Sequence, residues 1–439
     1  MVHAFKISDR FYIFDVESNN LFNVDELIYS IIEKQDLSGF SAEEIAEAKA
    51  EIKELTDSGL IYTQWSTDVS FEKSTYIKSM CLHLSHDCNL RCKYCFADEG
   101  AYHGKRENMP TEIAKAAIDF LIASSGNIKN LEVDFFGGEP LLNFDVLKET
   151  VAYAKEQAQK AGKFFKFTTT TNGILLDEEI SEYLNKEMDN VVLSLDGRRE
   201  VHDNARPTPN GKGSFDVVWD KFKYFRSIRG NKSYFLRGTF TKENLDFCED
   251  VLFMADYFDQ VSVEPVVLPK GHKMALEKFD LPVLCEQYEK LAIEYVKRRR
   301  NPHKWFGFFH FNIDLNNGPC LKKRLMGCGA GCSYCAVTPD GSIYPCHQFA
   351  GEKEFVLGNV FDKHLNDSVR NLFFNSNLKD KPDCQNCWAK YQCSGGCAAN
   401  AIHFSGDINK PYALACELLR KRLECALYIY DMEHNFSQN

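Results

Sequence analysis

The sequence has no cysteine before Cys81, no long apolar run and no extended basic block. No stretch approaches the ~18–20 apolar residues that a membrane-spanning helix needs, and residues 1–10 do not form the pattern of a signal peptide. The longest basic run is Lys297–Arg300, and 52 Lys and Arg residues against 63 Asp and Glu residues give a net charge of −11. We therefore expect a cytoplasmic protein that binds neither nucleic acid nor a membrane.

Cysteine is abundant in the rest of the chain. Of 17 cysteines, nine lie between Cys320 and Cys397. Because the chain shows no export signal, this number favours metal ligation over disulfides. The length of 439 residues is typical of roughly three domains. We expect a first unit over residues 1–66, a polar linker over 67–79, and two larger domains over 80–300 and 301–439.

The first unit combines strand and helix signals. Residues 11–16 and 20–24 predict two short strands, Asp25 is placed to cap a helix, and Ser41 begins a capping box for a second helix. A closing strand over residues 60–64 would complete a winged-helix-like module. The second helix is rich in glutamate, which argues against DNA binding.

Residues 80–300 alternate between strand and helix patterns. The predicted helices include Thr111–Ala123, which begins after Pro110, and residues 144–160. Repeated strand–helix units indicate a parallel sheet with right-handed crossovers, and in such folds the chemistry lies at the carboxyl ends of the strands. The six predicted strands cover residues 81–85, 131–136, 165–170, 191–195, 235–240 and 261–264.

Three cysteines form a compact motif directly after the first of these strands. Cys88, Cys92 and Cys95 have the spacing C-x3-C-x2-C, which can turn three thiolates toward one iron–sulfur cluster. Such clusters usually take four cysteines, so three would leave one iron open. A zinc ion would need a fourth ligand nearby, for which His83 or His86 is a candidate, so the spacing alone leaves zinc open.

With Tyr94 before its third cysteine, this motif resembles the signature of the radical S-adenosylmethionine (AdoMet, SAM) enzymes. In that family the open iron binds the amino and carboxylate groups of AdoMet. The resemblance implies that Cys88, Cys92 and Cys95 hold the catalytic cluster. It also implies that the six strands form an open, partial (β/α)6 barrel, which makes the fold class α/β.

The same resemblance assigns the other strand ends to AdoMet. The turn Gly137-Gly138-Glu139-Pro140 follows the second strand, and Glu139 would lie within reach of the amino group of AdoMet. Arg237 and Glu264 enter from strands five and six, and either a ligand contact or a structural ion pair suits them. The residues implied to contact the cofactor are Tyr94, Gly137, Gly138, Glu139, Pro140, Asn172, Ser194, Asp196 and Arg206, of which Arg206 would pair with its carboxylate.

The remaining cysteine clusters match a second pattern. From Cys328 onward they follow the C-x(9–15)-G-x4-C … C-x2-C-x5-C-x3-C … C spacing of the SPASM extension, which holds two auxiliary [4Fe–4S] clusters in that family. Zinc-ribbon sites are the alternative. Cys332 and Cys335 lie inside this segment, where they would supply an alternative ligand or a redox pair. The resemblance implies one cluster on Cys320, Cys328, Cys346 and Cys397 and another on Cys384, Cys387, Cys393 and Cys416.

The order of the three units resembles the SCIFF and ranthipeptide thioether-forming maturases. This implies that the N-terminal domain is a peptide-recognition domain that captures the leader of a cysteine-rich precursor peptide as an added strand. It also implies that AdoMet and three [4Fe–4S] clusters join a cysteine sulfur to a carbon, with an electron donor such as flavodoxin or ferredoxin. The alternatives are carbon–carbon crosslinking, sulfatase-type residue oxidation, and a metal-bearing peptide-binding scaffold without catalysis.

Overall fold

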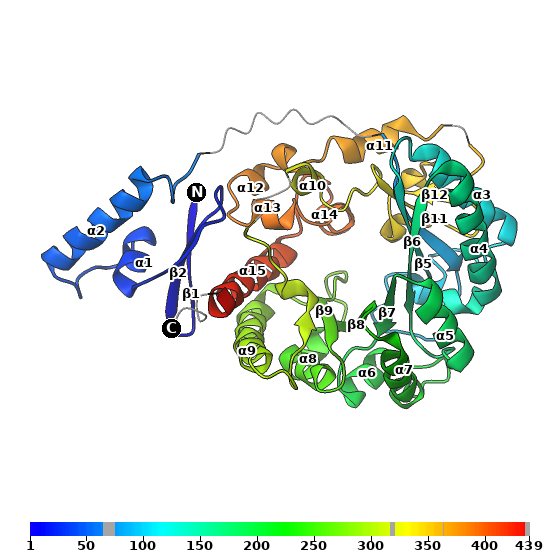
Figure 1. The fold of residues 1–439 in the computed structure, drawn as a ribbon, viewed down its shortest axis with the longest axis horizontal. Coiled ribbons are helices and arrows are strands. Elements are labelled where there is room, and N and C mark those ends of the chain that lie inside the picture. Colours follow the sequence, from blue (N-terminus) through cyan, green and yellow to red (C-terminus); the bar gives the residue numbers. More distant parts are fainter. Residues whose placement is uncertain (65–74, 317–320, 363, 435–439) are drawn as a thin grey trace.

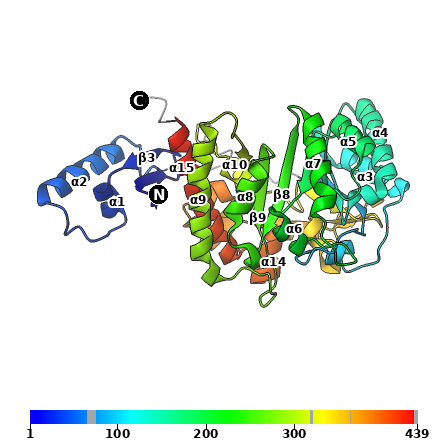
Figure 2. The same ribbon diagram turned by 90° about the horizontal axis from the view of Figure 1, so that it is seen from below.

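A ten-stranded sheet, curved into an open ring, organises the chain in the computed structural model (Figure 1). The structure describes residues 1–64, 75–316, 321–362 and 364–434. The strand order is β10-β9-β8-β7-β6-β5-β4-β11-β12-β13, and the strands from β4 to β9 pair in parallel. Helices cover the outside of this ring in both ribbon views (Figures 1 and 2). The predicted α/β fold with a partial barrel is confirmed.

The six predicted strands all form, each within two residues of its expected ends. The strands are β4 (Ser79–Ser85), β5 (Asn130–Gly137), β6 (Phe164–Thr171), β7 (Asn190–Ser194), β8 (Ser233–Phe240) and β9 (Gln260–Pro265). The outer helices between and after them are α3 (Thr111–Ser124), α4 (Phe144–Ala161), α5 (Glu178–Glu187), α6 (Arg199–Ala205), α7 (Phe215–Arg229), α8 (Phe247–Ala255) and α9 (Leu281–Arg299).

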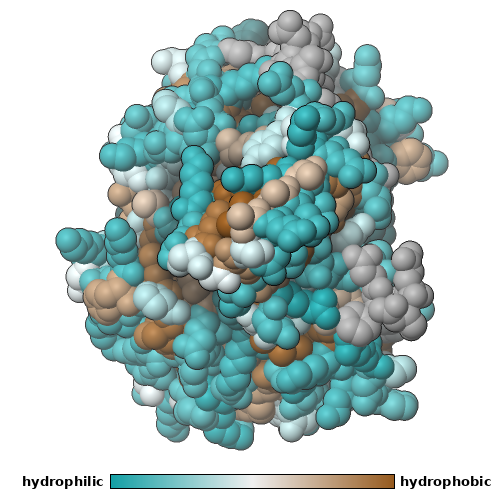
Figure 3. Space-filling model, turned by 90° about the vertical axis from the view of Figure 1, so that its left-hand side faces the viewer, coloured by the Kyte–Doolittle hydropathy of each residue, from teal (hydrophilic) through white to brown (hydrophobic). Residues whose placement is uncertain are grey.

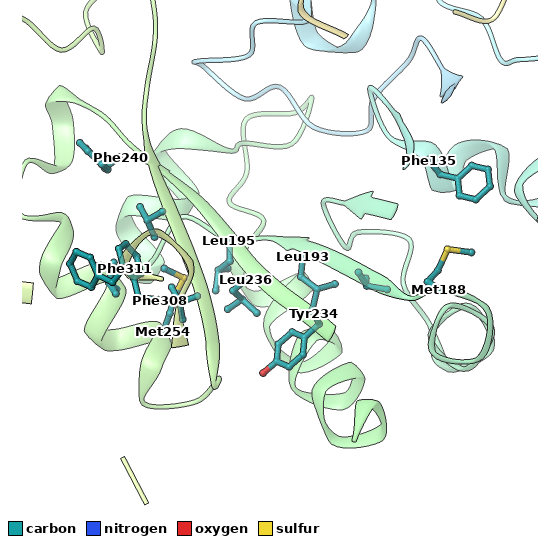
Figure 4. Packing of buried hydrophobic residues seen from close by; sticks show 14 of the residues in the cluster. Phe135, Met188, Leu193, Leu195, Tyr234, Leu236, Phe240, Met254, Phe308 and Phe311 are labelled. Carbon is teal, nitrogen blue, oxygen red and sulfur yellow. The ribbon is translucent and has the colours of Figure 1, made fainter. Parts of the chain in front are cut away.

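The main hydrophobic core lies between the sheet and its outer helices. Leu193, Leu195 and Leu236 are fully buried there, and Figure 4 shows Leu195 and Leu236 near Met254 of α8. Because successive side chains of a strand point to opposite faces, every second residue faces the interior of the ring instead. The interior-facing residues are mainly polar, which prepares this side of the sheet for a ligand.

The C-terminal region completes the ring and joins the same sheet. Strand β11 (Tyr334–Val337) pairs in parallel with β4, the strand that precedes the three-cysteine motif. The other C-terminal strands are β10 (Gly307–Phe308), β12 (Ser342–Tyr344) and β13 (Gly358–Asn359). The C-terminal helices are α10 (Leu321–Met326), α11 (Asp367–Phe374), α12 (Pro382–Gln385), α13 (Lys390–Cys393), α14 (Ala398–Ser405) and α15 (Ala413–His434).

The N-terminal unit is a three-stranded antiparallel sheet followed by two helices. It contains β1 (Val2–Ile7), β2 (Arg10–Asp15), β3 (Leu21–Val24), α1 (Glu26–Ile32) and α2 (Ala42–Asp57). The predicted caps are confirmed, because Asp25 accepts from the Ile28 amide and Ser41 and Glu44 form a capping box. Strand β1 was not predicted, because its own residues give only a weak strand pattern. It is held by antiparallel hydrogen bonds to β2.

The prediction of a closing strand over residues 60–64 is wrong. Residues 60–62 form a bend after the turn at residues 58–59, in which Ile61 is buried against the small sheet while Tyr62 has a positive φ. Most of the predicted linker, residues 67–74, lies outside the described residues. The linker and the domain boundaries therefore stay predictions.

The N-terminal sheet packs against the loop that carries two of the auxiliary cysteines (Figure 1). His3 stacks on Trp388 with ring centroids 3.9 Å apart, and Glu17 pairs with Lys390 at 2.7 Å. The Tyr391 hydroxyl also donates to Glu17, at 2.9 Å. Trp388, Lys390 and Tyr391 all lie between Cys387 and Cys393, so the first unit is tied directly to this cysteine loop.

No helix in the described parts of the chain is long and apolar enough to cross a membrane.

Candidate functional site

The three-cysteine motif forms a loop beyond the carboxyl end of β4. The Cys95 thiol lies close enough to Cys88 and Cys92 to add to the burial that raises their pKa values. Burial is the larger cause, and it raises the pKa of Cys88 and of Cys92 to about 12. A positively charged metal centre would reverse this effect, because thiolates are the form of cysteine that ligates metals.

The geometry around this loop fits a cluster better than a single zinc ion. Among the residues that the structure describes, no group of three or more His, Cys, Asp or Glu side chains is placed to hold one metal ion. His83 and His86, the two candidate zinc ligands, instead face each other with Nδ1 and Nε2 3.0 Å apart. An iron–sulfur cluster accepts wider sulfur positions than one ion and prefers a donor set made of cysteines alone.

Contacts that the sequence did not reveal hold this loop in shape. The Arg91 guanidinium pairs with Glu99 at 3.0 Å, and Arg106 pairs with both Glu99 and Asp87. The Asp87 carboxylate in turn accepts from the Cys88 amide at 2.8 Å. No sequence pattern marks Arg106, since it approaches the loop only through the turns after Cys95.

The Gly137–Pro140 turn packs directly on the cysteine loop. The Gly138 amide donates to the Ser85 carbonyl at 2.8 Å, and the Glu139 amide donates to the Asp87 carbonyl at 2.9 Å. A Cβ atom on Gly138 would lie 2.2 Å from the Asp87 carbonyl oxygen. The glycines therefore allow the turn and the loop to share one surface at the ends of β4 and β5.

Glu139 joins the ends of β5 and β6. Its buried carboxylate accepts from the Thr171 hydroxyl and the Asn172 amide, each at 2.8 Å, and from the Leu141 amide at 3.1 Å. Burial raises the pKa of Glu139 to about 7 against the effect of these donors. The Asn172 side chain reaches the cysteine loop, where it donates to Asn89 Oδ1 at 2.7 Å. The Glu139–Asn172 pair thus lies beside the motif, and its contact with AdoMet stays a prediction.

Asp196 and Arg206 form a second network beyond the end of β7. The Arg206 guanidinium binds both carboxylate oxygens of Asp196, at 3.0 and 3.1 Å. The Tyr94 hydroxyl and the Thr239 amide also donate to Asp196, at 2.7 and 2.9 Å. Tyr94 is thereby connected to Asp196 and Arg206, while the guanidinium of Arg206 already has a carboxylate partner within the protein. Ser194 lies buried at the end of the same strand, β7.

Arg237 and Glu264 do form an ion pair, with Nη2 and Oε1 3.7 Å apart. Glu264 also faces His310 at 3.4 Å and Arg422 at 3.7 Å. Although burial raises the pKa of Glu264, these three positive or protonatable groups outweigh that effect and lower it. The cluster connects the interior of the barrel to α15.

Four C-terminal cysteines converge around one cavity. This cavity, of about 210 Å³, is lined by Cys384, Cys387, Cys393 and Cys416. Burial and the neighbouring thiols raise the pKa of Cys416 to about 12. The structure thus brings together the four residues that the sequence grouped for one auxiliary cluster.

Three further cysteines form a separate group. Burial raises the pKa of the Cys346 thiol well above its usual value, and the neighbouring thiols of Cys397 and Cys328 add to this effect. Cys320, the fourth residue grouped with them, lies outside the described residues. Cys332 and Cys335, the other two cysteines of this segment, are buried in different hydrophobic clusters.

Lys381 lies between the two cysteine groups, and sequence reasoning missed it. Its side chain is buried, and its ammonium donates to the Gly395 carbonyl at 2.9 Å. Burial lowers the pKa of Lys381, and thiols of both cysteine groups oppose this shift. A lysine just before the Cys384 motif is unremarkable in sequence, so only the folded arrangement reveals this charge.

Two family models match the chain. Residues 82–254 match the radical SAM superfamily, and residues 328–388 match the SPASM iron–sulfur cluster-binding domain. A cysteine-type anaerobic sulfatase-maturating enzyme of Clostridium novyi is 26% identical over 72% of this chain and 86% of its own length. The radical SAM cyclopropyl synthase TigE of Paramaledivibacter caminithermalis is 25% identical over 83% of this chain and 78% of its own.

Solved structures share the fold. The structure of anSMEcpe with bound AdoMet has a TM-score of 0.65 at 19% identity, and the match covers 82% of this chain and 100% of that one. Streptococcus suis SuiB bound to its precursor peptide SuiA has a TM-score of 0.55 at 18% identity, covering 95% of this chain and 100% of SuiB. These structures show the fold, while the two family models, together with the three-cysteine loop at the end of β4, identify a radical SAM domain over residues 82–254 and a SPASM domain over residues 328–388.

Proposed function

We propose that this protein is a peptide maturase that forms intramolecular thioether crosslinks in a ribosomally made, cysteine-rich precursor peptide. The observation that carries the proposal is the convergence of three separate cysteine groups on one barrel: the motif after β4, the cavity with Cys416, and the group around Cys346. A peptide-binding scaffold without catalysis would not need the motif after β4, whose three cysteines leave one iron of a cluster open.

The residues present fit the expected cofactors. Cys88, Cys92 and Cys95 would hold the catalytic cluster, and the Glu139 and Asp196 networks would line AdoMet. The two auxiliary clusters would be held by Cys320, Cys328, Cys346 and Cys397 and by Cys384, Cys387, Cys393 and Cys416. When bound, the reduced cluster and AdoMet supply a 5′-deoxyadenosyl radical that removes a hydrogen atom, and the auxiliary clusters take up an electron.

The chain's own residues position the segments around the proposed AdoMet site. The Glu139 amide holds the glycine turn against the cysteine loop through the Asp87 carbonyl, and the Asp196–Arg206 pair fixes Tyr94. The charged group around Glu264 lies on β9, across the interior from the glycine turn. Glu264 lines the same pocket as Cys397 and Cys416. This arrangement lets one peptide segment lie between the AdoMet site and the auxiliary cysteines.

The N-terminal unit is proposed to capture the leader of the peptide. Strand β3 pairs with β2 on one side, and its other edge has no strand partner among the described residues. The face of the molecule on this side is mainly hydrophilic, with apolar patches near its centre (Figure 3). Such an edge accepts an extended peptide through main-chain hydrogen bonds.

Leader peptides methylated on single backbone nitrogens test this mode of binding. Methylation at alternate positions is expected to weaken binding to the full-length protein by roughly fivefold per lost hydrogen bond, because a charge-free N–H···O bond contributes about 1 kcal/mol. Methylation at the intervening positions is expected to have little effect. Equal tolerance at all positions, measured by fluorescence anisotropy, would show that side chains rather than the strand edge hold the leader.

A second radical reaction is the main alternative. The relatives include a sulfatase-maturating enzyme and a cyclopropyl synthase, so residue oxidation and carbon–carbon bond formation remain candidates for the same scaffold. The nature of the bond, rather than the radical chemistry, separates these reactions.

An anaerobic assay distinguishes them. The protein is reconstituted with iron and sulfide and incubated with AdoMet, a reductant such as reduced flavodoxin, and a cysteine-rich precursor peptide. We expect about twelve irons per chain, as three four-iron clusters require. We also expect deoxyadenosine, a peptide lighter by two hydrogens per crosslink, and one alkylatable thiol lost per crosslink. Unchanged thiols with deoxyadenosine would indicate a different bond, and clusters without deoxyadenosine would contradict an enzymatic role.

A further inference from the structure

Asp134 is an acidic side chain inside the barrel to which the proposed cofactor sites give no role. It lies on β5, three residues before Gly137, which a strand rise of about 3.3 Å per residue converts to roughly 10 Å below the glycine turn. Its partners in register are Cys81 on β4 and Thr168 on β6. Asp134 therefore lies on the interior face of the sheet, in the same row as these two side chains.

The Asp134 carboxylate lacks the contacts that usually stabilise a shielded acid. Its Oδ1 atom is shielded and has no hydrogen-bond partner among the described residues. Arg237 on β8 attracts it from across the interior, but the ion pair of Arg237 is made with Glu264. The other titratable groups that interact with Asp134 are Cys81 on β4 and Tyr334 on β11. A buried acceptor without a hydrogen-bond partner lowers the stability of the folded protein unless a ligand donates the missing hydrogen bond.

Part of the inner face of the sheet near Asp134 is exposed to solvent. Arg237 belongs to a central strand and faces inward, yet 55% of its side chain is exposed. Lys166 on β6 also faces inward and is exposed. Solvent therefore reaches the inner face of the sheet beside the row that holds Asp134.

We propose that Asp134 accepts the proton that the substrate releases as the new bond forms. The inference rests on the proposed radical oxidation of a peptide. For a thioether, a C–H bond and an S–H bond break and a C–S bond forms. The hydrogen atom goes to the 5′-deoxyadenosyl radical, the thiol proton to the Asp134 carboxylate, and the remaining electron to an oxidised iron–sulfur cluster. A carbon–carbon crosslink or residue oxidation releases one proton in the same way.

The acidity of Asp134 suits this role. Burial, only partly offset by Arg237, raises the pKa of Asp134 to about 7. A carboxylate with a pKa near the working pH is both ionised in a large fraction of molecules and basic enough to take a proton. Asp134 must be deprotonated to act, so product formation should rise as the pH increases through about 7 and level off above it.

The test compares D134N with the matched control E132Q. Glu132 lies two residues earlier on the same face of β5 and is exposed, so E132Q removes a similar charge without a shielded site. Two-hydrogen peptide oxidation and deoxyadenosine are measured separately between pH 6 and 8.5. D134N is expected to lose oxidised peptide by roughly 100-fold or more and to lose the pH dependence, with deoxyadenosine within about threefold, since a general base typically contributes 10²–10⁴-fold. E132Q should match the wild type.

The results that overturn the proposal are distinct from failure of the proposed function. Oxidised peptide from D134N at the wild-type rate and pH profile would exclude Asp134. So would equal loss of deoxyadenosine in a variant with a full complement of iron, because that places Asp134 in binding or positioning.

If D134N does not load iron, D134E must retain activity with a shifted pH midpoint, and an unchanged midpoint overturns the proposal. If the wild type oxidises no peptide, the proposed function fails, and infrared titration of the carboxyl band in wild type and D134N decides whether Asp134 ionises near pH 7.

Discussion

Cys92→Ala is expected to abolish deoxyadenosine formation. Cys92 lies at the centre of the motif, where burial and the neighbouring thiols of Cys95 and Cys88 raise its pKa. Replacing a residue that merely supports a metal ligand typically costs 10–100-fold in affinity or activity, so loss of a ligand should cost more than roughly 100-fold. The iron content should fall by about four atoms per chain, the content of one cubane cluster. Iron analysis and chromatography of deoxyadenosine check both effects.

The matched control is Cys248→Ala. Cys248 is also fully buried, and burial raises the pKa of its thiol to about 12, but it packs in α8 within the main hydrophobic core. A variant there tests loss of a buried thiol without loss of a ligand, and it should keep its iron and its deoxyadenosine. Cys92→Ala with the iron content and deoxyadenosine of the wild type would show that the motif does not hold the catalytic cluster.

The barrel could be predicted from sequence because each of its strands has a local signal. Strands such as Leu131–Phe136 combine apolar residues with β-branched or aromatic ones and are followed by a helical pattern. The N-terminal sheet was harder, because β1 depends on pairing with β2 more than on its own residues. The expected strand over residues 60–64 does not form: Leu60 and Ile61 have a strand-like composition but lie in a bend without a strand partner among the described residues, where Ile61 packs on the small sheet.

The candidate site shows the same division between local and long-range information. The cysteine motif and the glycine turn are continuous in sequence, so their spacing alone indicates their chemistry. The residues that contact these motifs are distant from them in sequence. Arg106 reaches Asp87, and Thr239 reaches Asp196, only because the folded barrel brings them together. Asp134 carries no motif of its own, and its shielded, unpartnered oxygen is a property of the folded chain alone.

Gly138→Ala is expected to destabilise the site strongly, because the added Cβ atom would meet main-chain atoms. It would lie 2.2 Å from the Asp87 carbonyl oxygen and 2.9 Å from the Gly100 Cα atom. Backbone cannot rotate away as a side chain can, so the turn and the cysteine loop must separate. Overpacking of this kind typically costs about 1–3 kcal/mol. We expect a lower melting temperature and loss of iron from the catalytic site.

Gly39→Ala is the control for this prediction, because a Cβ atom at Gly39 would meet nothing within 4 Å. Its melting temperature and iron content should equal those of the wild type. The separation of the turn from the loop in Gly138→Ala should also break the hydrogen bonds from the Gly138 and Glu139 amides to the carbonyls of Ser85 and Asp87. Since AdoMet is proposed to bind where these two segments meet, AdoMet affinity should fall together with iron content. A Gly138→Ala protein that binds iron and AdoMet normally would show that the close contact between turn and loop is not what forms the site.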